Sequence, residues 1–485
     1  MLNGPTDLQQ DSLPILVQLA TTDSGLALMI DSLDNGTALV RAVADLLGQA
    51  EISEGTVNLC VALLRRILSG APQKVDTPSL ISRISVWSLA LDRVATLFYQ
   101  RHSALKFTLL NCLCEALSAI PDDQTTMFDA WLRSGDVRLD PMSEKSTALL
   151  YRSLLRIKLA IMDIQRRNTD TYDAKDIGIL LTAQLLRLLG EHFILPVGSP
   201  LLPWSLAAVD NIIKQDNEST DPLVEDTTQP APDDVDGTPP RTNVEKFIPL
   251  AIGMAGVELR MLLDERLICP PGGALDELAA KRQEWLVPAC LEILETGIRL
   301  LTLVEDDALP ELPADISTLS PARWTEANRL TQLVCYVISR QSSEEILAWL
   351  IRLKDTFAAT VEFLEEMMSR SGLENLARDL VGIAVFRVLC CWLSQDFSLL
   401  KDYPQMISIF GNIVQTSQSD LLSDSWEPIL SLMIPPVHLW VSIIEDTEAD
   451  QSTTPLEIIS QSNRDEVLQM ASILRKRFPD SAFHQ

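Results

Sequence analysis

Apolar residues recur at helical spacing along most of this chain, whereas strand-like alternation never extends beyond a few residues. The clearest case is residues 246–267, KFIPLAIGMAGVELRMLLDERL, where four large apolar residues follow at i, i+4, i+7 and i+11. They are Leu250, Met254, Val257 and Met261. This spacing places them on one stripe of an α-helix, so the sequence predicts a helix with that stripe buried. Gly253 and Gly256 lie on another face and leave room for close approach of a second helix.

The same period predicts helices in both halves of the chain, separated by turns rich in Gly, Pro and Asn. In the first half we expect helices at 57–68, 78–99, 104–120, 122–133, 142–167, 173–192 and 204–214. In the second half we expect them at 284–305, 322–340, 343–370, 373–395, 404–416, 427–444 and 464–478. Helix pairs that recur about every 40–47 residues are typical of armadillo or HEAT units. The sequence therefore predicts an all-α, armadillo/HEAT-like helical-repeat solenoid.

Residues 215–242 interrupt this pattern. They are rich in Asp, Glu and Pro, contain no Lys or Arg before Arg241, and offer too few apolar residues to form a core. We interpret this stretch as an acidic, disordered linker. It divides the chain into an N-terminal helical-repeat lobe at 1–214 and a C-terminal helical-repeat lobe at 243–485.

The charge balance restricts the partners that the chain can attract. The 39 basic and 67 acidic residues give a net charge of −28, which repels nucleic acid and anionic lipid and attracts basic protein surfaces. No Lys or Arg precedes Arg41, so the start of the chain lacks the pattern of a secretory signal. The longest uncharged runs each contain three prolines, which disfavours transmembrane helices. We expect a cytoplasmic protein without a transmembrane segment; its oligomeric state stays open.

No residue pattern in the sequence indicates catalysis, a cofactor or a metal. The four histidines have no partner at metal-ligand spacing, and the eight cysteines form no C-x-x-C pair. We expect most of the cysteines to be buried, reduced thiols. The Asp234-Val-Asp-Gly-Thr238 sequence resembles a phosphotransferase loop, but it does not follow a strand and is interpreted as chance within the acidic linker.

Three stretches resemble the neurochondrin family. They are 256–265 (GVELRMLLDE), 287–298 (VPACLEILETGI) and 386–401 (FRVLCCWLSQDFSLLK), in the order and approximate spacing of that family. The resemblance extends through most of the chain, and we expect the chain to be shorter than the family at both ends. It implies an armadillo-like cytoplasmic protein without known catalytic residues. Within these stretches, the candidates for contacts with a partner or between repeats are Glu258, Arg260, Arg387 and Trp392.

The resemblance and the charge together favour a non-catalytic scaffold that binds protein partners through a helical-repeat surface. Two alternatives stay open: a transport or assembly protein that acts like a chaperone, and an unrecognised enzyme. An enzyme would depend on individual polar side chains, whereas a scaffold would depend on an extended surface.

Overall fold

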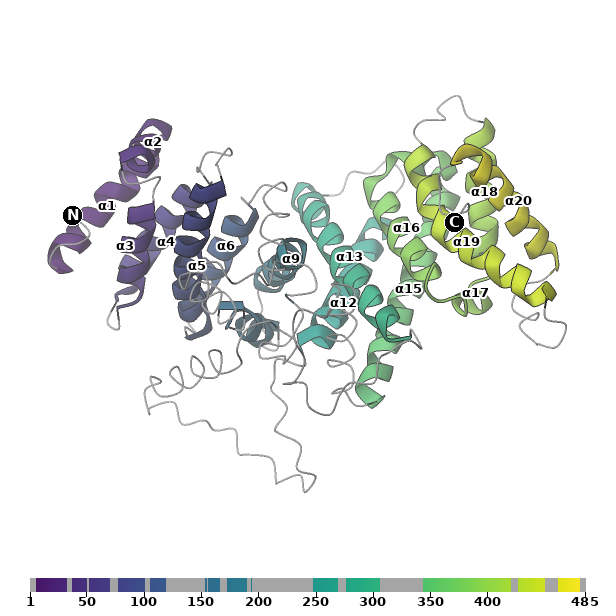
Figure 1. The fold of residues 1–485 in the computed structure, drawn as a ribbon, viewed down its shortest axis with the longest axis horizontal. Coiled ribbons are helices and arrows are strands. Elements are labelled where there is room, and N and C mark those ends of the chain that lie inside the picture. Colours follow the sequence, from purple (N-terminus) through teal and green to yellow (C-terminus); the bar gives the residue numbers. More distant parts are fainter. Residues whose placement is uncertain are drawn as a thin grey trace, which may run out of the picture. The chain divides into compact units, whose positions relative to one another are not determined.

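A computed structural model describes residues 6–32, 37–49, 52–69, 77–100, 105–118, 153–154, 156–165, 172–189, 193, 247–268, 276–305, 343–419, 426–449 and 461–479. All regular secondary structure within these ranges is helical, which confirms the all-α prediction (Figure 1). The elements of the first half are α1 (Thr6–Ala20), α2 (Asp23–Ser32), α3 (Thr37–Leu47), α4 (Glu54–Ser69), α5 (Thr77–Gln100), α6 (Leu105–Ser118) and α9 (Tyr172–Leu189). Those of the second half are α12 (Phe247–Ile268), α13 (Glu277–Glu305), α15 (Ser343–Ser371), η4 (Leu373–Arg378), α16 (Leu380–Leu393), α17 (Leu399–Asp402), α18 (Gln405–Ser419), α19 (Glu427–Ala449) and α20 (Gln461–Arg477).

These residues form two compact units. The first contains the described residues up to Leu250, and the second contains 251–305 and 343–479, so the boundary between the units falls inside α12. The predicted linker at 215–242 and the predicted helices at 122–133, 204–214 and 322–340 lie outside the described residues. The assignment of 1–214 and 243–485 to two lobes therefore stays a prediction.

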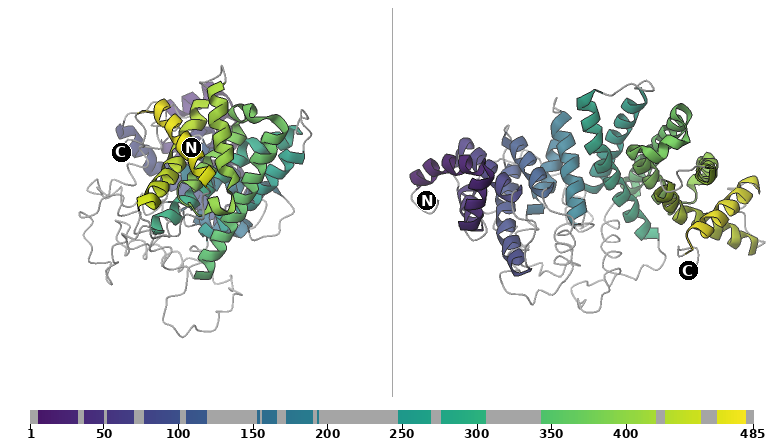
Figure 2. Two further views of the ribbon diagram at one scale, coloured as in Figure 1. Left: turned by 90° about the vertical axis from the view of Figure 1, so that its right-hand side faces the viewer. Right: turned by 90° about the horizontal axis from the view of Figure 1, so that it is seen from above.

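In the first unit, each helix packs on helices that are close to it along the chain, which is the arrangement of stacked helical repeats. Helix α3 packs on α5, α4 on α6, and α6 on α9, and the views agree that these helices lie side by side (Figures 1 and 2). Charged pairs join the layers: Arg156 lies 3.2 Å from the fully buried Asp92, and Lys106 lies 2.5 Å from Asp163. The two pairs join residues that are 64 and 57 positions apart in the sequence, so they link helices that are separate along the chain.

The second unit is built around one row of helices. Helix α16 packs between α13 and α19, α15 covers α16 and η4, and α18 and α20 pack on each other and on α19. Large aromatic side chains fill this core. The ring of Phe410 lies 5.2 Å from that of Phe386 and 5.1 Å from that of Trp440, measured between centroids. The candidate surfaces described below lie on exposed faces of helices in this unit.

The stretch that gave the clearest helical pattern is a helix, but the prediction of its buried stripe was wrong. Val257 is 60% exposed and Met261 37% exposed, whereas the core face of α12 carries mainly Ala, Ile and Leu. The reason is the close approach predicted from the glycines. A Cβ on Gly256 would lie 2.5 Å from the hydroxyl oxygen of Thr356, and one on Gly253 would lie 2.7 Å from the guanidinium of Arg352. Because α15 packs against this small-residue face, the larger apolar stripe is turned outward.

The predicted single helix at 373–395 is two elements in the structure. Gly372 has φ of 79°, a left-handed conformation that ends α15 and that glycine adopts without strain. Asp379 then begins a new helix, because its carboxylate accepts a hydrogen bond from the backbone N–H of Val381 at 3.2 Å. Arg266 of α12 donates to the same carboxylate at 2.8 Å. The cap therefore ties the start of α16 to α12.

Helix α19 is apolar and long enough to cross a membrane, the one such helix in the described part of the chain. Half of its window at Glu427–Glu445 is buried within the protein. The buried residues include Met433, Val437 and Trp440, which face the helices that pack on α19. This burial is typical of a core helix, and the expectation that the chain lacks a transmembrane segment stays a prediction.

Candidate interaction surfaces

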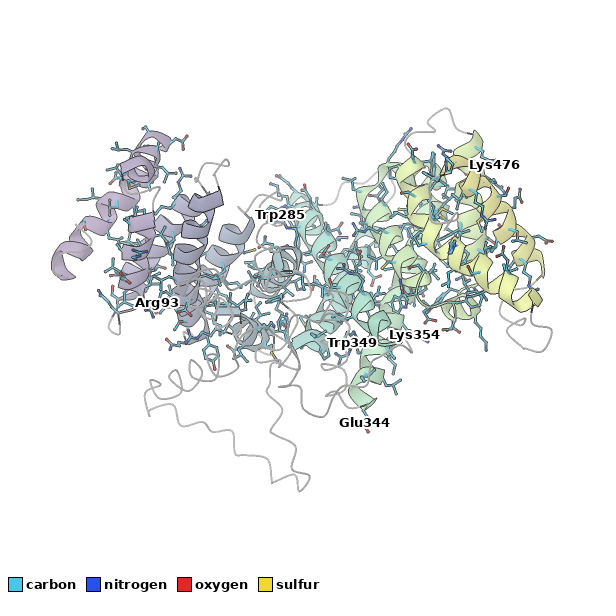
Figure 3. All side chains as sticks on the ribbon, viewed as in Figure 1. Arg93, Trp285, Glu344, Trp349, Lys354 and Lys476 are labelled. Carbon is cyan, nitrogen blue, oxygen red and sulfur yellow. The ribbon has the colours of Figure 1, made fainter. Side chains whose placement is uncertain are left out.

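Exposed apolar side chains lie along the seam between α12 and α13. Val257 and Met261 lie one turn apart on α12, and Leu278 and Trp285 lie two turns apart on α13, where they are 77% and 62% exposed. Figure 3 labels Trp285. Glu258 and Leu262, which follow Val257 and Met261 on α12, contact Arg282 and Gln283 of α13 across this seam. We call these four residues, Val257, Met261, Leu278 and Trp285, the α12–α13 surface. Trp and Met are enriched in the surfaces through which proteins bind one another.

Glu258 forms the charged bridge of this seam. Its carboxylate accepts a hydrogen bond from the guanidinium of Arg282, and the whole residue is only 7% exposed. The same guanidinium lies 3.8 Å from the carboxylate of Glu265, about two helical turns further along α12. Glu258 thus joins neighbouring helices. Its carboxylate stabilises the packing of α12 on α13, which carry the α12–α13 surface, and is not presented to solvent.

Arg260 and Arg387 occupy different environments. Arg260 is exposed, on the side of α12 that is not buried against other helices. Arg387 of α16 donates to Glu295 of α13 at 2.9 Å. That hydrogen bond, with the negative charges of Glu295 and Glu292, raises the pKa of Arg387 despite the opposing effect of burial. Because the Arg387 side chain is 55% exposed, this bridge lies at the rim of the α13–α16 contact.

Trp392 belongs to the core. It is 7% exposed, and its ring packs edge-on against Phe357 of α15 at 5.1 Å between centroids. The ring of Tyr403 also lies 5.1 Å from that of Phe357, between centroids. Trp392 therefore contributes through packing, because its ring contacts Phe357, which in turn contacts Tyr403. The four candidate residues are not brought together at one site.

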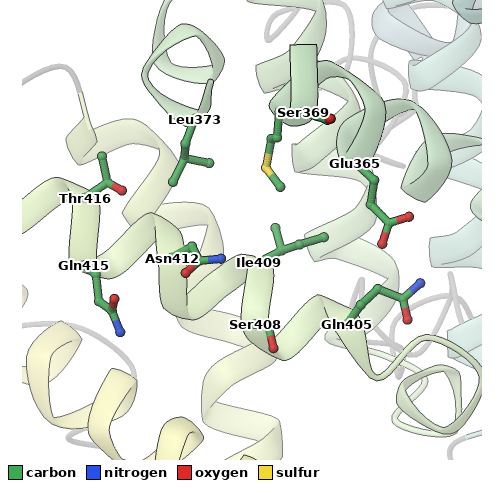
Figure 4. Close-up of a pocket in the computed structure, with 10 residues that line it drawn as sticks. Glu365, Ser369, Leu373, Gln405, Ser408, Ile409, Asn412, Gln415 and Thr416 are labelled. Atoms are coloured by element: carbon green, nitrogen blue, oxygen red, sulfur yellow. The ribbon is translucent and has the colours of Figure 1, made fainter. Parts of the chain in front are cut away.

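A groove that the sequence did not indicate lies along one face of α18. It has a volume of about 660 Å³ and lies between the end of α15, the start of η4 and one face of α18 (Figure 4). Along α18, polar residues at i, i+3, i+7 and i+10 line it, a spacing that is visible in the sequence once this face is known to be exposed. Its lining residues are Glu365, Met368, Ser369, Leu373, Gln405, Ser408, Ile409, Asn412, Gln415 and Thr416. We call this site the α15–α18 groove.

The described residues contain no cluster that could bind a metal, and their thiols are not paired in disulfides. No group of three His, Cys, Asp or Glu within them could hold a metal ion. The described thiols are free, and most are buried, as expected. Burial raises the pKa of the Cys60 thiol to about 12 and that of Cys391 to about 11, so both are protonated at neutral pH. These thiols are poor nucleophiles.

One buried titratable group does depart strongly from its ordinary state. Lys158 is 1% exposed, and its amine lies 5.0 Å from the ring centroid of Phe193 and 6.0 Å from that of Phe247. Burial lowers the pKa of this lysine to about 7. The aromatic faces partly compensate the charged form. We interpret Lys158 as a core residue of the first unit, enclosed by the rings.

Stacked amphipathic helices that pack on one another along the chain define a helical-repeat protein of the armadillo/HEAT type. The family model of neurochondrin matches residues 3–408. The chain belongs to the neurochondrin family, which is not a known family of enzymes. Comparison with curated proteins and with solved structures gives no match.

Proposed function

We propose that the chain is a non-catalytic, cytoplasmic scaffold that binds protein partners through its helical-repeat surface. The observation that carries this proposal is the α12–α13 surface. Val257 and Trp285 are each about 60% exposed although they lie on well-packed helices, and burying such side chains against a partner would contribute about 25 cal/mol per Å² of apolar area. Trp is also among the residues that most often dominate binding energy.

The net charge of −28 selects among partners. It disfavours a second copy of the same chain, because two such copies repel one another, and it disfavours nucleic acid and anionic lipid for the same reason. A protein with a basic rim around an apolar contact would be attracted over a Debye length of about 8 Å at physiological salt. The partner class that fits best is therefore a basic protein surface.

The proposal is tested by affinity capture from cytosol with the full chain and two matched double variants. The first changes Val257 and Trp285 to Ser, and the control changes Leu347 and Ile351 to Ser; these residues of α15 are similarly exposed, at 58% and 50%. We expect the first variant to lose a set of partners that the control retains, and added salt to weaken capture of that set. Capture that is unaffected by both variants and by salt would contradict the proposal.

A further inference from the structure

Methionine side chains are distributed unevenly between the core and the surface. Among the methionines whose side chains the structure describes, Met261 is the exposed one, at 37%. Met254 and Met368 are half-buried. The others are 9% exposed or less: Met29, Met162, Met367, Met406, Met433 and Met470. Met261 is therefore the described thioether that a small oxidant in solution reaches most easily.

Met261 also lies beside the charged bridge between α12 and α13. Glu258 precedes it by three residues and Glu265 follows it by four, so both are its neighbours on the surface of the helix. Both carboxylates contact the guanidinium of Arg282, Glu258 through a hydrogen bond and Glu265 at 3.8 Å. The thioether thus lies where the two helices of the α12–α13 surface are joined, one turn from Val257.

Oxidation changes the chemistry of this position. The thioether sulfur attacks one oxygen of a hydroperoxide, the O–O bond breaks, and the products are methionine sulfoxide and water or an alcohol. The sulfur loses two electrons and the peroxide gains them. The new S–O group is a polar acceptor where an apolar side chain was. A partner that covers it without offering a donor leaves an unsatisfied polar group in the contact.

The described thiols are less suited to react with a peroxide. The thiolate is the reactive form of cysteine, and burial raises the pKa of Cys60 to about 12 and that of Cys391 to about 11. Cys112, Cys290 and Cys390 are buried as well. Within the described residues, a response to peroxide therefore falls to an accessible methionine rather than to a thiol.

We propose that Met261 is a reversible oxidation site that controls partner binding at the α12–α13 surface. With the thioether reduced, Met261 continues the apolar contact formed by Val257, Leu278 and Trp285. With the sulfoxide in place, a polar group lies among these side chains and the partner is released. A methionine sulfoxide reductase restores the thioether, as two thiols are oxidised to a disulfide and the sulfoxide oxygen leaves as water. This rests on the proposed function and adds how its surface is regulated.

The first part of the test needs no partner. The purified full chain is treated with limiting hydrogen peroxide, the reaction is stopped with catalase, and the sulfoxide at each methionine is followed by peptide mass spectrometry. Among the described methionines, Met261 should be oxidised first and the buried ones last. Met254 is the matched comparison, because it lies on the same helix but is half-buried. Oxidation of Met254 or Met368 as fast as Met261 would overturn the proposal.

The second part measures partner capture before and after oxidation. The chain, oxidised mainly at Met261, is immobilised and exposed to gel-filtered cytosol, which lacks the small cofactors that sulfoxide reductases need. Capture of the partners that depend on Val257 and Trp285 should fall about tenfold, as expected when one polar group is left unsatisfied in a contact. Treating the oxidised chain with sulfoxide reductase and dithiothreitol should restore capture.

Variants assign the response to Met261. Each variant is compared with itself, as the ratio of capture before and after peroxide. Met261→Leu keeps an apolar side chain of similar volume but cannot form a sulfoxide, so peroxide should leave its capture unchanged. The control Met368→Leu removes a half-buried methionine of α15 outside the α12–α13 surface and should keep the loss of capture. Both variants are checked for unchanged helicity.

The outcomes of the capture experiment separate the two proposals. Selective oxidation of Met261 without loss of capture would overturn the oxidation site and leave the proposed function standing. A loss of capture that persists in Met261→Leu would also overturn it, because another residue would then respond to the peroxide. Capture that depends on neither Val257 nor Trp285 would overturn the proposed function and the regulation of its surface together.

Discussion

The close approach of α12 and α15 at Gly256 makes a sharp prediction about stability. In an ordinary helix interior, Gly→Ala stabilises by about 1 kcal/mol, because alanine loses less backbone entropy on folding. At Gly256 the added methyl carbon would lie 2.5 Å from Oγ1 of Thr356. That threonine is buried, and its hydroxyl donates to the carbonyl of Arg352 at 2.8 Å, so it cannot move aside freely.

The two effects can be compared in magnitude. Overpacking a helix contact costs about 1–3 kcal/mol. Subtracting the gain in helix propensity of about 1 kcal/mol leaves Gly256→Ala destabilising by about 1 kcal/mol. Removing the obstacle reverses the sign: in a Thr356→Ala background, Gly256→Ala should stabilise by up to about 1 kcal/mol. The coupling between the two positions is then about 2 kcal/mol, within the range for residues in contact.

The assay is urea unfolding followed by circular dichroism and by tryptophan fluorescence, for both single variants and the double variant. Gly178→Ala in α9 is the matched control. It is also a buried helical glycine, but its nearest neighbour would be Cγ2 of Ile161 at 3.9 Å, an ordinary contact, so this change should stabilise. The reasoning is refuted if Gly256→Ala stabilises the protein as much as Gly178→Ala does.

Three further predictions follow from other parts of the molecule. In a double-mutant cycle, Glu258→Gln and Arg282→Gln should each lower the free energy of unfolding by about 2 kcal/mol. The double variant should be less destabilised than the sum of the two single variants by more than about 1 kcal/mol. Simple additivity would show that the pair is not coupled. The pKa of Lys158 is lowered from 10.5 to about 7 in the folded protein, so between these pH values the unfolded chain binds one proton more and the free energy of unfolding rises with pH. The slope of that free energy against pH should exceed the slope for Lys158→Met by up to about 1.4 kcal/mol per pH unit. Equal slopes for the two proteins would contradict the shift. Limited proteolysis should cut first within 215–242, where ordering the backbone would cost about 1–2 kcal/mol per residue, and protection equal to that of the helices would show that this stretch is packed.

Helix position was largely predictable, because it depends on local periodicity and on capping residues that the sequence displays directly. The helix predicted at 343–370 is α15, Ser343–Ser371, and that predicted at 246–267 is α12, Phe247–Ile268. The break between η4 and α16 was missed even though Asp379 is a strong helix-capping residue. A long apolar run on either side of it outweighed that signal.

The candidate sites were less predictable. The neurochondrin resemblance singled out Glu258 and Trp392, which the structure places in an inter-helix bridge and in the core. The residues available to a partner, Trp285 on α13 and the amides that line the α15–α18 groove, carried no motif. Polar residues at helical spacing describe every solvated helix face, so the spacing alone could not distinguish a groove from an open surface.

The sequence by itself determined that the chain is all-α, where its main helices lie, its family, and the sign of its electrostatic field, since each depends on local pattern or on total composition. Only the tertiary structure decided which face of each helix is buried. Helix α12 is apolar on two faces, and the choice between them was made by α15, which packs closely against Gly253 and Gly256 and leaves Val257 and Met261 exposed. The sequence of a helix shows its own periodicity but does not specify which neighbouring helix will cover each face. The surfaces that can bind partners are therefore defined only when the helices are packed together.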